Sequence, residues 1–565
     1  MTDLTRRLAV ARGDEPADLV VQGGRVLSVH TREWLQADVA VCDGWIAGVG
    51  DYRGRETLDA GGRYVVPGLI DAHLHLESSL LLVDEFAKLV LPFGTTSVVA
   101  DPHEIANVLG TDGVHWLADA CADLPLDVFF MASSCVPASR FESPRRALTT
   151  GDLEGLLRRR RVLGLAEMMN FPGVIAGDPD ELAKLGLEGA EHVDGHAPGV
   201  LGRRLQAYAA AGIGSDHEAT TPQEGRERLR AGMWLLIREA SGARNLDALL
   251  PLVHEFGAGR IAFCTDDREP GHIAREGHVN SMVRRAVESG VDARDALAMA
   301  SCNAAAWHGL GDRGAIGPGR RADLLVLPDL VRFLPDVVLK DGAQPAAPVA
   351  PPVPEWARRT VRIQPISPND LHTPDDGGSI RVIGLVPGQI VTESLALPAT
   401  VRDGLAVADP TRNLAKIAVA ERHLGTGRVG LGFVQGFGLQ RGAIASTVAH
   451  DAHNIVCVGV DDGDMARAIG RLAELGGGMV AVEGRGVRAE LPLPVAGLLS
   501  DQPLDVVLAQ SEALSDAAAA LGCTVEAPFH AMSFLALSVI PSLKITDQGL
   551  VDVDRFRLVS LAAGS

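Results

Sequence analysis

Two histidines stand one residue apart at the end of an apolar run in PGLIDAHLHLESS, residues 67–79. Side chains two residues apart on a β-strand face the same side, so His73 and His75 can bind one cation together. Such pairs also arise by chance, and on this motif alone a strand-end pair without a metal is the simpler interpretation. The choice depends on which other ligand-type residues the fold brings to the same place.

Ligand-type residues also end later strand-like runs, in VLGLAE, EHVDGH, GIGSDH and RIAFCTDD. Each has an ordinary alternative: the acids could cap helices, and the histidines could be hydrogen-bonded within loops. Such residues at five strand ends are hard to obtain by accident, and together they predict a site for a divalent metal such as Zn, Mn or Fe. The predicted ligands are His73, His75, Glu167, His196, His217 and Asp266.

The elements that must position these ligands read as an α/β fold, a closed (β/α)8 TIM-type barrel over residues 67–311. Eight strand-like runs alternate with helical patterns, and the fifth and sixth runs are short and polar. In such a barrel the carboxyl ends of the strands form the mouth, so the six ligands would share one rim. The runs end near His75, Asp101, Pro137, Glu167, His196, His217, Glu239 and Asp266.

Further segments flank the barrel. Residues 18–66 alternate apolar and polar positions between glycine-containing turns, and a matching pattern returns at 319–344. We therefore expect a small flanking β-sandwich built from both sides of the barrel, residues 1–66 and 312–350. A proline-rich linker, 342–356, then leads to a C-terminal α+β domain over residues 360–565.

Composition narrows the partners and the compartment. A formal net charge of -20 would repel a phosphate backbone, which argues against nucleic-acid binding. Seven dispersed cysteines without a CxxC pair suggest reduced thiols. We find no apolar stretch of the ~18 residues that a membrane span needs and no export signal at the N-terminus, so we expect no membrane partner and a cytoplasmic protein.

Several long motifs carry a family resemblance. VVPGLIDAHLHLESS resembles the opening of the amidohydrolase superfamily, metal-dependent barrels that hydrolyse C–N and related bonds. ADPHEIANVLG, SSCVPA, LAEMMNFPGV, VDGHAPG, GIGSDHE and CTDDREP, in this order, are similar to the long bacterial adenine deaminase family. GLGFVQGFGLQRGAIASTVAHDAHNIVCVGV, LPLPVAGLLS and SFLALSVIPSLKITDQGLVDV resemble the C-terminal extension of that family, so the likeness spans about residues 20 to 560.

The resemblance implies a mechanism: two divalent ions, Mn favoured with Fe or Zn as alternatives, share a bridging hydroxide that converts adenine to hypoxanthine and ammonia in purine salvage. Many amidohydrolases bridge their ions with a carbamylated lysine on strand four, but none of the five lysines of this chain can fill that place. Glu167 stands there instead. Asp266 would move a proton from the bridging water to the leaving amine. A homodimer would also fit the resemblance.

Polar residues around the mouth are candidates for holding the neutral purine substrate: Glu77, Ser78, Ser79, Asp101, His103, Glu104, Glu218 and Glu239. His103 and Glu104 could polarise the substrate, bind another metal or orient the ligands. In the C-terminal domain, AHDAHN (449–454) is either structural or a loop that closes the mouth, in its own subunit or a neighbour.

Three hypotheses about the function remain: an adenine deaminase, a relative acting on another aminopurine or a cyclic amide, and a metal-free scaffold. Retention of all six ligands counts against the scaffold. FESPRR, and SGARNL after the seventh strand, depart slightly from the family pattern, which leaves substrate tuning open.

Overall fold

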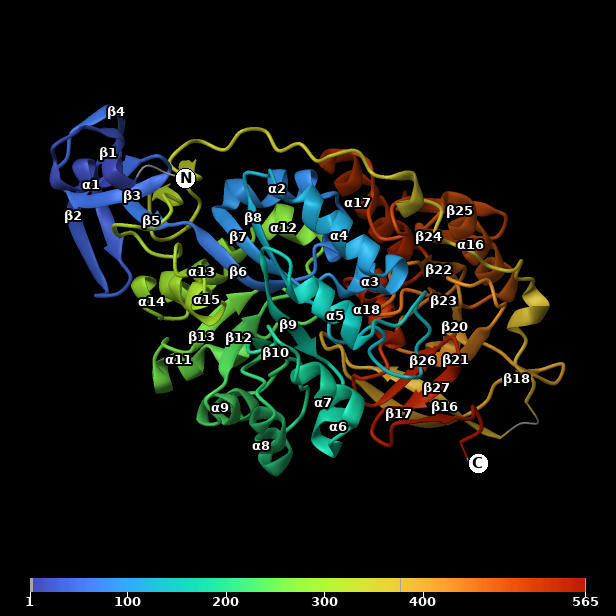
Figure 1. The fold of residues 1–565 in the computed structure, drawn as a ribbon. Helices are drawn as coiled ribbons and strands as arrows, with labels where there is room; N and C mark the ends of the chain where they lie inside the picture. Colours follow the sequence, from blue (N-terminus) through green and yellow to red (C-terminus); the bar gives the residue numbers. More distant parts are fainter. Residues whose placement is uncertain (1–3, 376–377, 564–565) are drawn as a thin grey trace.

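A ring of eight short strands forms the centre of the computed structural model, which describes residues 4–375 and 378–563 (Figure 1). Parallel pairing joins strands 6 to 10 and strands 11 to 13. Backbone bonds from Gly214 N to Val193 O (3.1 Å) and from Asp266 N to His73 O (3.0 Å) join these two sets. The strands are β6 (Leu69–Leu74), β7 (Thr95–Ala100), β8 (Asp127–Ala132), β9 (Val162–Met168), β10 (Val193–Gly195), β11 (Ser215–Asp216), β12 (Trp234–Arg238) and β13 (Ile261–Cys264).

Helices surround this ring, and most follow a strand in the chain, as in a βα-repeat. They are α2 (Val83–Val90), α3 (His103–Leu109), α4 (Thr111–Ala120), α5 (Thr150–Leu157), α6 (Phe171–Ala176), α7 (Pro179–Leu185), α8 (Gly202–Ala210), α9 (Pro222–Arg230), α10 (Leu246–Leu249), α11 (Pro251–Phe256), α12 (Pro270–Glu276), α13 (Val279–Glu288), α14 (Ala293–Met299) and α15 (Cys302–Trp307). The arrangement is a mixed α/β fold of the TIM type.

One strand end differs from the sequence prediction. The third strand, β8, ends at Ala132 and not near Pro137. The reason is that the next two residues turn their hydroxyls to other partners: Ser133 donates to Asp101 Oδ1 at 2.8 Å, and Ser134 donates to the backbone oxygen of Glu167 at 2.8 Å. The fifth and sixth strands, expected to be weak, span three and two residues.

A seven-stranded sheet flanks the ring and takes strands from both sides of it in the sequence. The first strand, β1, pairs in parallel with two different strands: its residues 17–22 pair with β4, and its residues 25–26 pair with β5. Helix α1 (Leu4–Arg12) precedes the sheet. Its strands are β1 (Ala17–Ser28), β2 (Glu33–Cys42), β3 (Trp45–Gly50), β4 (Gly54–Asp59), β5 (Tyr64–Pro67), β14 (Leu324–Leu327) and β15 (Val337–Leu339).

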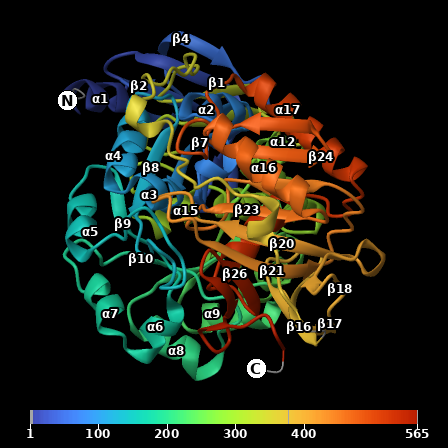
Figure 2. The same cartoon turned by 90° about the vertical axis from the view of Figure 1, so that its right-hand side faces the viewer.

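The C-terminal part of the chain packs against one side of the barrel (Figure 2). Its eight-stranded sheet has the order β17-β16-β21-β20-β23-β22-β24-β25. The bounds are β16 (Ser379–Leu385), β17 (Thr392–Pro398), β20 (Leu414–Ala420), β21 (Val429–Gln435), β22 (Ala443–Ser446), β23 (Ile455–Gly459), β24 (Gly478–Glu483) and β25 (Gly486–Pro492). Smaller sheets contain β18 (Val401–Arg402) and β19 (Leu405–Ala406), and β26 (Leu543–Thr546), β27 (Gly549–Asp552) and β28 (Arg557–Val559). The helices are α16 (Asp462–Leu475), α17 (Leu504–Ala520) and α18 (Pro528–Ser533).

A shared hydrophobic core ties this C-terminal part to the barrel. Leu74 and Val98 of the barrel belong to the same buried cluster as Ile417, Val456 and Leu535 of the C-terminal part. The proline-rich segment before it runs as an extended yellow chain from the flanking sheet across to the C-terminal elements (Figure 1). Within 4–375 and 378–563, no helix is long and apolar enough to cross a membrane.

Candidate metal centre

The six predicted ligands lie together at the carboxyl ends of the barrel strands. His73 is in β6 and His75 directly follows that strand, and Glu167 is in β9. His196 directly follows β10, His217 directly follows β11, and Asp266 is the second residue after β13. All six are buried, with exposed fractions of 1–5%. The period of two on β6 and the strand-end rule for a barrel therefore place these side chains where the sequence predicts them.

Glu167 lies at the centre of four imidazoles. Its Oε1 is 3.3 Å from His75 Nε2 and 3.7 Å from His73 Nε2. Its Oε2 is 2.6 Å from His196 Nδ1 and 3.3 Å from His217 Nε2. Burial alone would raise the pKa of this carboxyl, but His217 and His196 outweigh burial and hold its pKa well below the ordinary value. Glu167 is thus an anion with one oxygen directed to each half of the cluster.

Asp266 faces the same cluster from the opposite strand end. Its Oδ1 is 3.1 Å from His75 Nε2 and 3.9 Å from His73 Nε2, and its Oδ2 is 4.0 Å from His217 Nε2. The backbone of Asp266 has φ of 55°, a left-handed conformation that is uncommon for a residue other than glycine. The fold holds this carboxylate in a strained position, which is typical of functional sites.

The donor set fits divalent cations. Ligand atoms of His73, His75 and Asp266 lie within 4.8 Å of one another, as do those of His73, Glu167 and His217. Burial, followed by the charge of His217, lowers the pKa of His73 to about 3, so its imidazole is neutral and has a free electron pair. Nε2 of His73 and Nε2 of His196 are buried without a hydrogen-bond partner among the described residues. Together the two sets offer imidazole and carboxylate donors, which suit a divalent first-row metal.

A backbone contact fixes the ring of His75. Its Nδ1 is 3.0 Å from the carbonyl oxygen of Asp101 and donates to it, and its Nε2 faces the carboxylates of Glu167 and Asp266. Asp101 itself accepts from the backbone N of His103 (3.1 Å) and lies 3.0 Å from His103 Nδ1. Asp101 therefore orients residues around the centre from just outside it.

Arg238 is a member of the site that the sequence analysis missed. It ends β12, and its guanidinium contacts both oxygens of Glu218 and donates to Asp266 Oδ2 at 3.0 Å. Burial would raise the pKa of Glu218, but Arg238 and then His196 hold that pKa at about 2. Glu218 Oε1 also lies 3.4 Å from His217 Nε2. A buried cation thus keeps two carboxylates charged beside the histidines.

Glu239 is not brought to the centre. Its carboxylate pairs with Arg285 and accepts from the backbone N of Leu246 at 3.2 Å. The two residues at this strand end therefore differ in direction, and Arg238 rather than Glu239 faces the histidines.

The other candidates for holding substrate form a network beside the centre. Ser78 donates to Glu104 at 3.1 Å and also contacts Asp267. Glu77 accepts from the backbone N of Ile105 at 3.0 Å. Ser79 donates to Leu76 O at 2.6 Å, within its own turn. Ser78 is therefore oriented toward the mouth, whereas Ser79 stabilises the local turn.

The loop 449–454 of the C-terminal part reaches this network within the same chain. His450 Nδ1 is 3.3 Å from Glu104 Oε1, and Asp451 Oδ1 is 3.4 Å from His103 Nε2. His453 accepts from the backbone N of Ala449 through Nδ1 at 3.1 Å, so its Nε2 carries the proton, 3.8 Å from Glu104 Oε2. His453 in this tautomer supports Glu104 and does not offer Nε2 to a metal.

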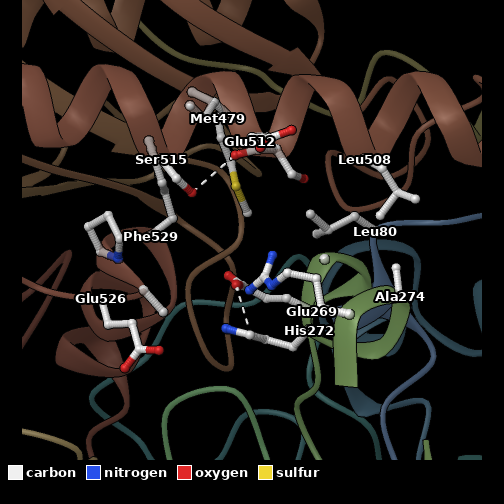
Figure 3. A pocket seen from close by; sticks show the side chains of 16 residues that line it. Leu80, Glu269, His272, Ala274, Met479, Leu508, Glu512, Ser515, Glu526 and Phe529 are labelled. Atoms are coloured by element: carbon white, nitrogen blue, oxygen red, sulfur yellow. Dashed lines mark hydrogen bonds and ion pairs between the residues drawn. The ribbon is translucent and has the colours of Figure 1, made fainter. Parts of the chain in front are cut away.

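A cavity of about 360 Å³ lies between α12 of the barrel and α17 of the C-terminal part, and none of the six predicted ligands lines it. Figure 3 shows Glu269 and His272 on the barrel side, opposite Met479 and Glu512. Phe529 of α18 also lines it. The cavity thus borders the segment that follows Asp266 and Asp267.

Known proteins share both parts of this chain. The amidohydrolase family model matches residues 64–344, which include all six predicted ligands, and the model of the adenine deaminase C-terminal domain matches residues 389–557. The matched barrel is thus that of a metal-dependent hydrolase. Some relatives match nearly the whole chain. An adenine deaminase of Desulfatibacillum aliphaticivorans is 48% identical over 564 residues, covering 98% of this chain and 99% of that protein. One of Archaeoglobus fulgidus is 46% identical over 561 residues, covering 99% and 98%.

The chain belongs to the adenine deaminase family. Among solved structures, a crystal structure of an adenine deaminase is 16% identical, covers 55% of this chain and 89% of that chain, and has a TM-score of 0.42.

Proposed function

We propose that this protein hydrolyses adenine to hypoxanthine and ammonia at a centre for two divalent ions, as part of purine salvage. The observation that carries the proposal is Glu167, whose two oxygens are directed to different pairs of imidazoles. Bound ions would lower the pKa of water so that it attacks at neutral pH. The relatives named as adenine deaminases support the choice of substrate.

The ligands in this proposal are His73, His75, Glu167, His196, His217 and Asp266. Asp266 accepts the proton of the attacking water and delivers it to the departing 6-amino group, because its Oδ1 faces the histidines and its charge is maintained by Arg238. Glu167 supplies the shared negative charge without a modified lysine. Ser78, Glu104 and Glu218 are proposed to contact or orient the purine, together with Glu77, Asp101 and His103.

A substrate screen tests the activity. Ammonia release is measured with adenine, guanine, cytosine, adenosine and isoguanine after loading the protein with manganese. We expect adenine to give the highest kcat/KM. Preference for another aminopurine, with adenine inert, would assign the protein to a different reaction of the same type.

Replacing Glu167 tests the centre itself. Glu167→Gln keeps the shape but removes the charge that faces four imidazoles, so we expect loss of stoichiometric metal and a fall of at least about 100-fold in kcat. Metal content is measured by mass spectrometry and activity by ammonia release. Glu269→Gln, a change in the neighbouring cavity, is the control and should keep its metal. Wild-type turnover in Glu167→Gln would exclude the bridging role.

We also propose manganese as the resident metal, with iron or zinc as alternatives, and a cytoplasmic homodimer as the working form. The seven cysteines are all free, which supports a reducing compartment. Domain limits of 1–66 with 312–350, 67–311 and 360–565 are proposed as the folding units, the first as a small flanking β-sandwich and the last as an α+β domain. Light scattering tests the dimer, and limited proteolysis tests the limits.

A further inference from the structure

His530 in α18 belongs to the C-terminal part but packs against a barrel loop. A Cβ on Gly242, which lies between β12 and α10, would be 2.3 Å from Nδ1 of His530 and 2.5 Å from its Cε1. No side chain would fit at that position while the imidazole stays in place. The ring therefore occupies space that the loop leaves open only because residue 242 is glycine, in the SGARNL segment that departs from the family pattern.

The ring lies beside the metal centre. Asp267, His450 and Asp266 are all near enough to influence its pKa. Phe534 lies 4.9 Å from His530 between ring centroids and stacks on His450 at 4.3 Å. These three rings form an aromatic row along the C-terminal side of the mouth. Phe529, one residue before His530, lines the cavity in Figure 3.

The hydrogen-bonding capacity of this imidazole is unused. His530 is 6% exposed. Neither of its ring nitrogens has a hydrogen-bond partner among the described residues, although the backbone of Asp267 lies nearby. Burial lowers its pKa to about 4, so the ring is neutral at pH 7 and has one N–H donor and one acceptor. Buried polar groups in folded proteins nearly always have partners, so an unpaired pair of nitrogens beside a reaction centre indicates a ligand that binds there.

We propose that His530 is a specificity-determining residue that hydrogen-bonds N3 or N7 of the purine substrate from the C-terminal side of the mouth. A purine offers both acceptor nitrogens and one ring N–H, and a neutral imidazole complements either kind. The inference rests on the proposed function, because it assumes a purine at the metal centre. It adds a residue of the C-terminal part to substrate selection.

Steady-state kinetics of the manganese-loaded protein give the first test. His530→Met keeps the bulk but removes both hydrogen-bonding nitrogens, and we expect kcat/KM for adenine to fall about 3- to 10-fold, mainly through KM. His530→Gln retains a donor and an acceptor and should recover part of the loss. His254→Met, at an exposed position of α11, is the matched control and should equal the wild type.

Substrate analogues separate a direct contact from a structural effect. The ratio of kcat/KM for adenine to that for 3-deazaadenine, and the same ratio for 7-deazaadenine, are measured in each variant. The ratio for the analogue that lacks the contacted nitrogen should be about 3- to 10-fold smaller in His530→Met than in the wild type. The wild type loses a hydrogen bond with that analogue, whereas the variant has no such bond to lose. The intrinsic effect of the missing nitrogen cancels in this comparison.

The space at Gly242 gives a second variant that leaves His530 in the chain. Gly242→Ala must displace the ring, so it should cause the same change in one analogue ratio, and the double variant Gly242→Ala/His530→Met should show no further change. This variant also keeps the test open if His530→Met does not fold.

The outcomes separate the two proposals. A wild-type protein that releases no ammonia from adenine refutes the proposed function. An active wild type, with both analogue ratios unchanged within two-fold in His530→Met and Gly242→Ala, refutes the role of His530 alone.

Discussion

Removing the charge of Arg238 should destabilise the apo barrel. The guanidinium lies 3.0 Å from Asp266 Oδ2 and contacts both oxygens of Glu218. The two carboxylates are 5% and 1% exposed, so little solvent is available to replace the arginine. Arg238→Met therefore leaves two buried anions without their main cation.

The size of the effect follows from this geometry. At an effective dielectric constant of about 20, one charge pair at this separation interacts by roughly 5–6 kcal/mol. Desolvation offsets part of that, and breaking a buried pair by removing one partner costs about 3–5 kcal/mol. For a unit the size of the barrel, about 2–4 °C is lost per kcal/mol, so we expect the melting temperature to fall by roughly 6–20 °C.

Calorimetry of metal-free protein measures this shift. Arg238→Lys keeps a point charge and loses only the two-pronged contact, so it should cost less than Arg238→Met. Arg313→Met is the control at the other end of the barrel: it removes one of the cations that pair with Asp127, but Lys340 and Arg161 remain, so it should lower stability by less and leave metal content unchanged. A fall under about 2 °C in Arg238→Met, or equal falls in the lysine and methionine variants, would show that the electrostatic reasoning is wrong.

Lys544 is buried and has no charged partner among the residues that the structure describes, and burial lowers its pKa to about 7. Between pH 7 and about 10 the unfolded chain therefore binds more protons than the folded one, and stability should rise with pH. Lys544→Met lacks this dependence, so its excess in free energy of unfolding over the wild type should shrink by about 1.4 kcal/mol per pH unit as pH rises from 7. Denaturant midpoints measure this difference, and a difference that stays constant with pH would contradict the prediction. Gly430→Ala would place Cβ 1.9 Å from the backbone oxygen of Thr546, so it should cost at least about 1–3 kcal/mol and expose β26 and β27 to protease, whereas Gly470→Ala, with open space around it, should not destabilise the protein.

That the six proposed ligands lie together could be predicted, because two regularities suffice to bring them to one place. The period of two places His73 and His75 on one face, and a barrel gathers its strand ends at one mouth. Glu167 is the single acid at the end of its strand, whereas Asp266 has Asp267 beside it, so these two rules alone do not separate Asp266 from Asp267. The coarse fold follows from the same alternation of strands and helices.

The direction of Arg238 could not be predicted. Strand β12 is buried on both faces, so its residues show no alternation of apolar and polar side chains from which the inward face could be determined. A shift of one residue exchanges Arg238 for Glu239, and only the register with β13 decides between them. The approach of His450 and His530 from the C-terminal part likewise depends on contacts between residues more than 180 positions apart, which no local pattern records.

The pairing of β5 with strands from both flanks of the barrel has a consequence for synthesis on the ribosome. Strand β5 pairs with β1 on one side and with β14 on the other, yet β14 begins at Leu324, long after β5 ends at Pro67. At about 5–20 residues per second, roughly 10–50 seconds pass before that partner emerges. During this time the nascent chain carries an open strand edge, so newly made protein should depend on chaperones that bind unpaired edges until translation has passed the second flank.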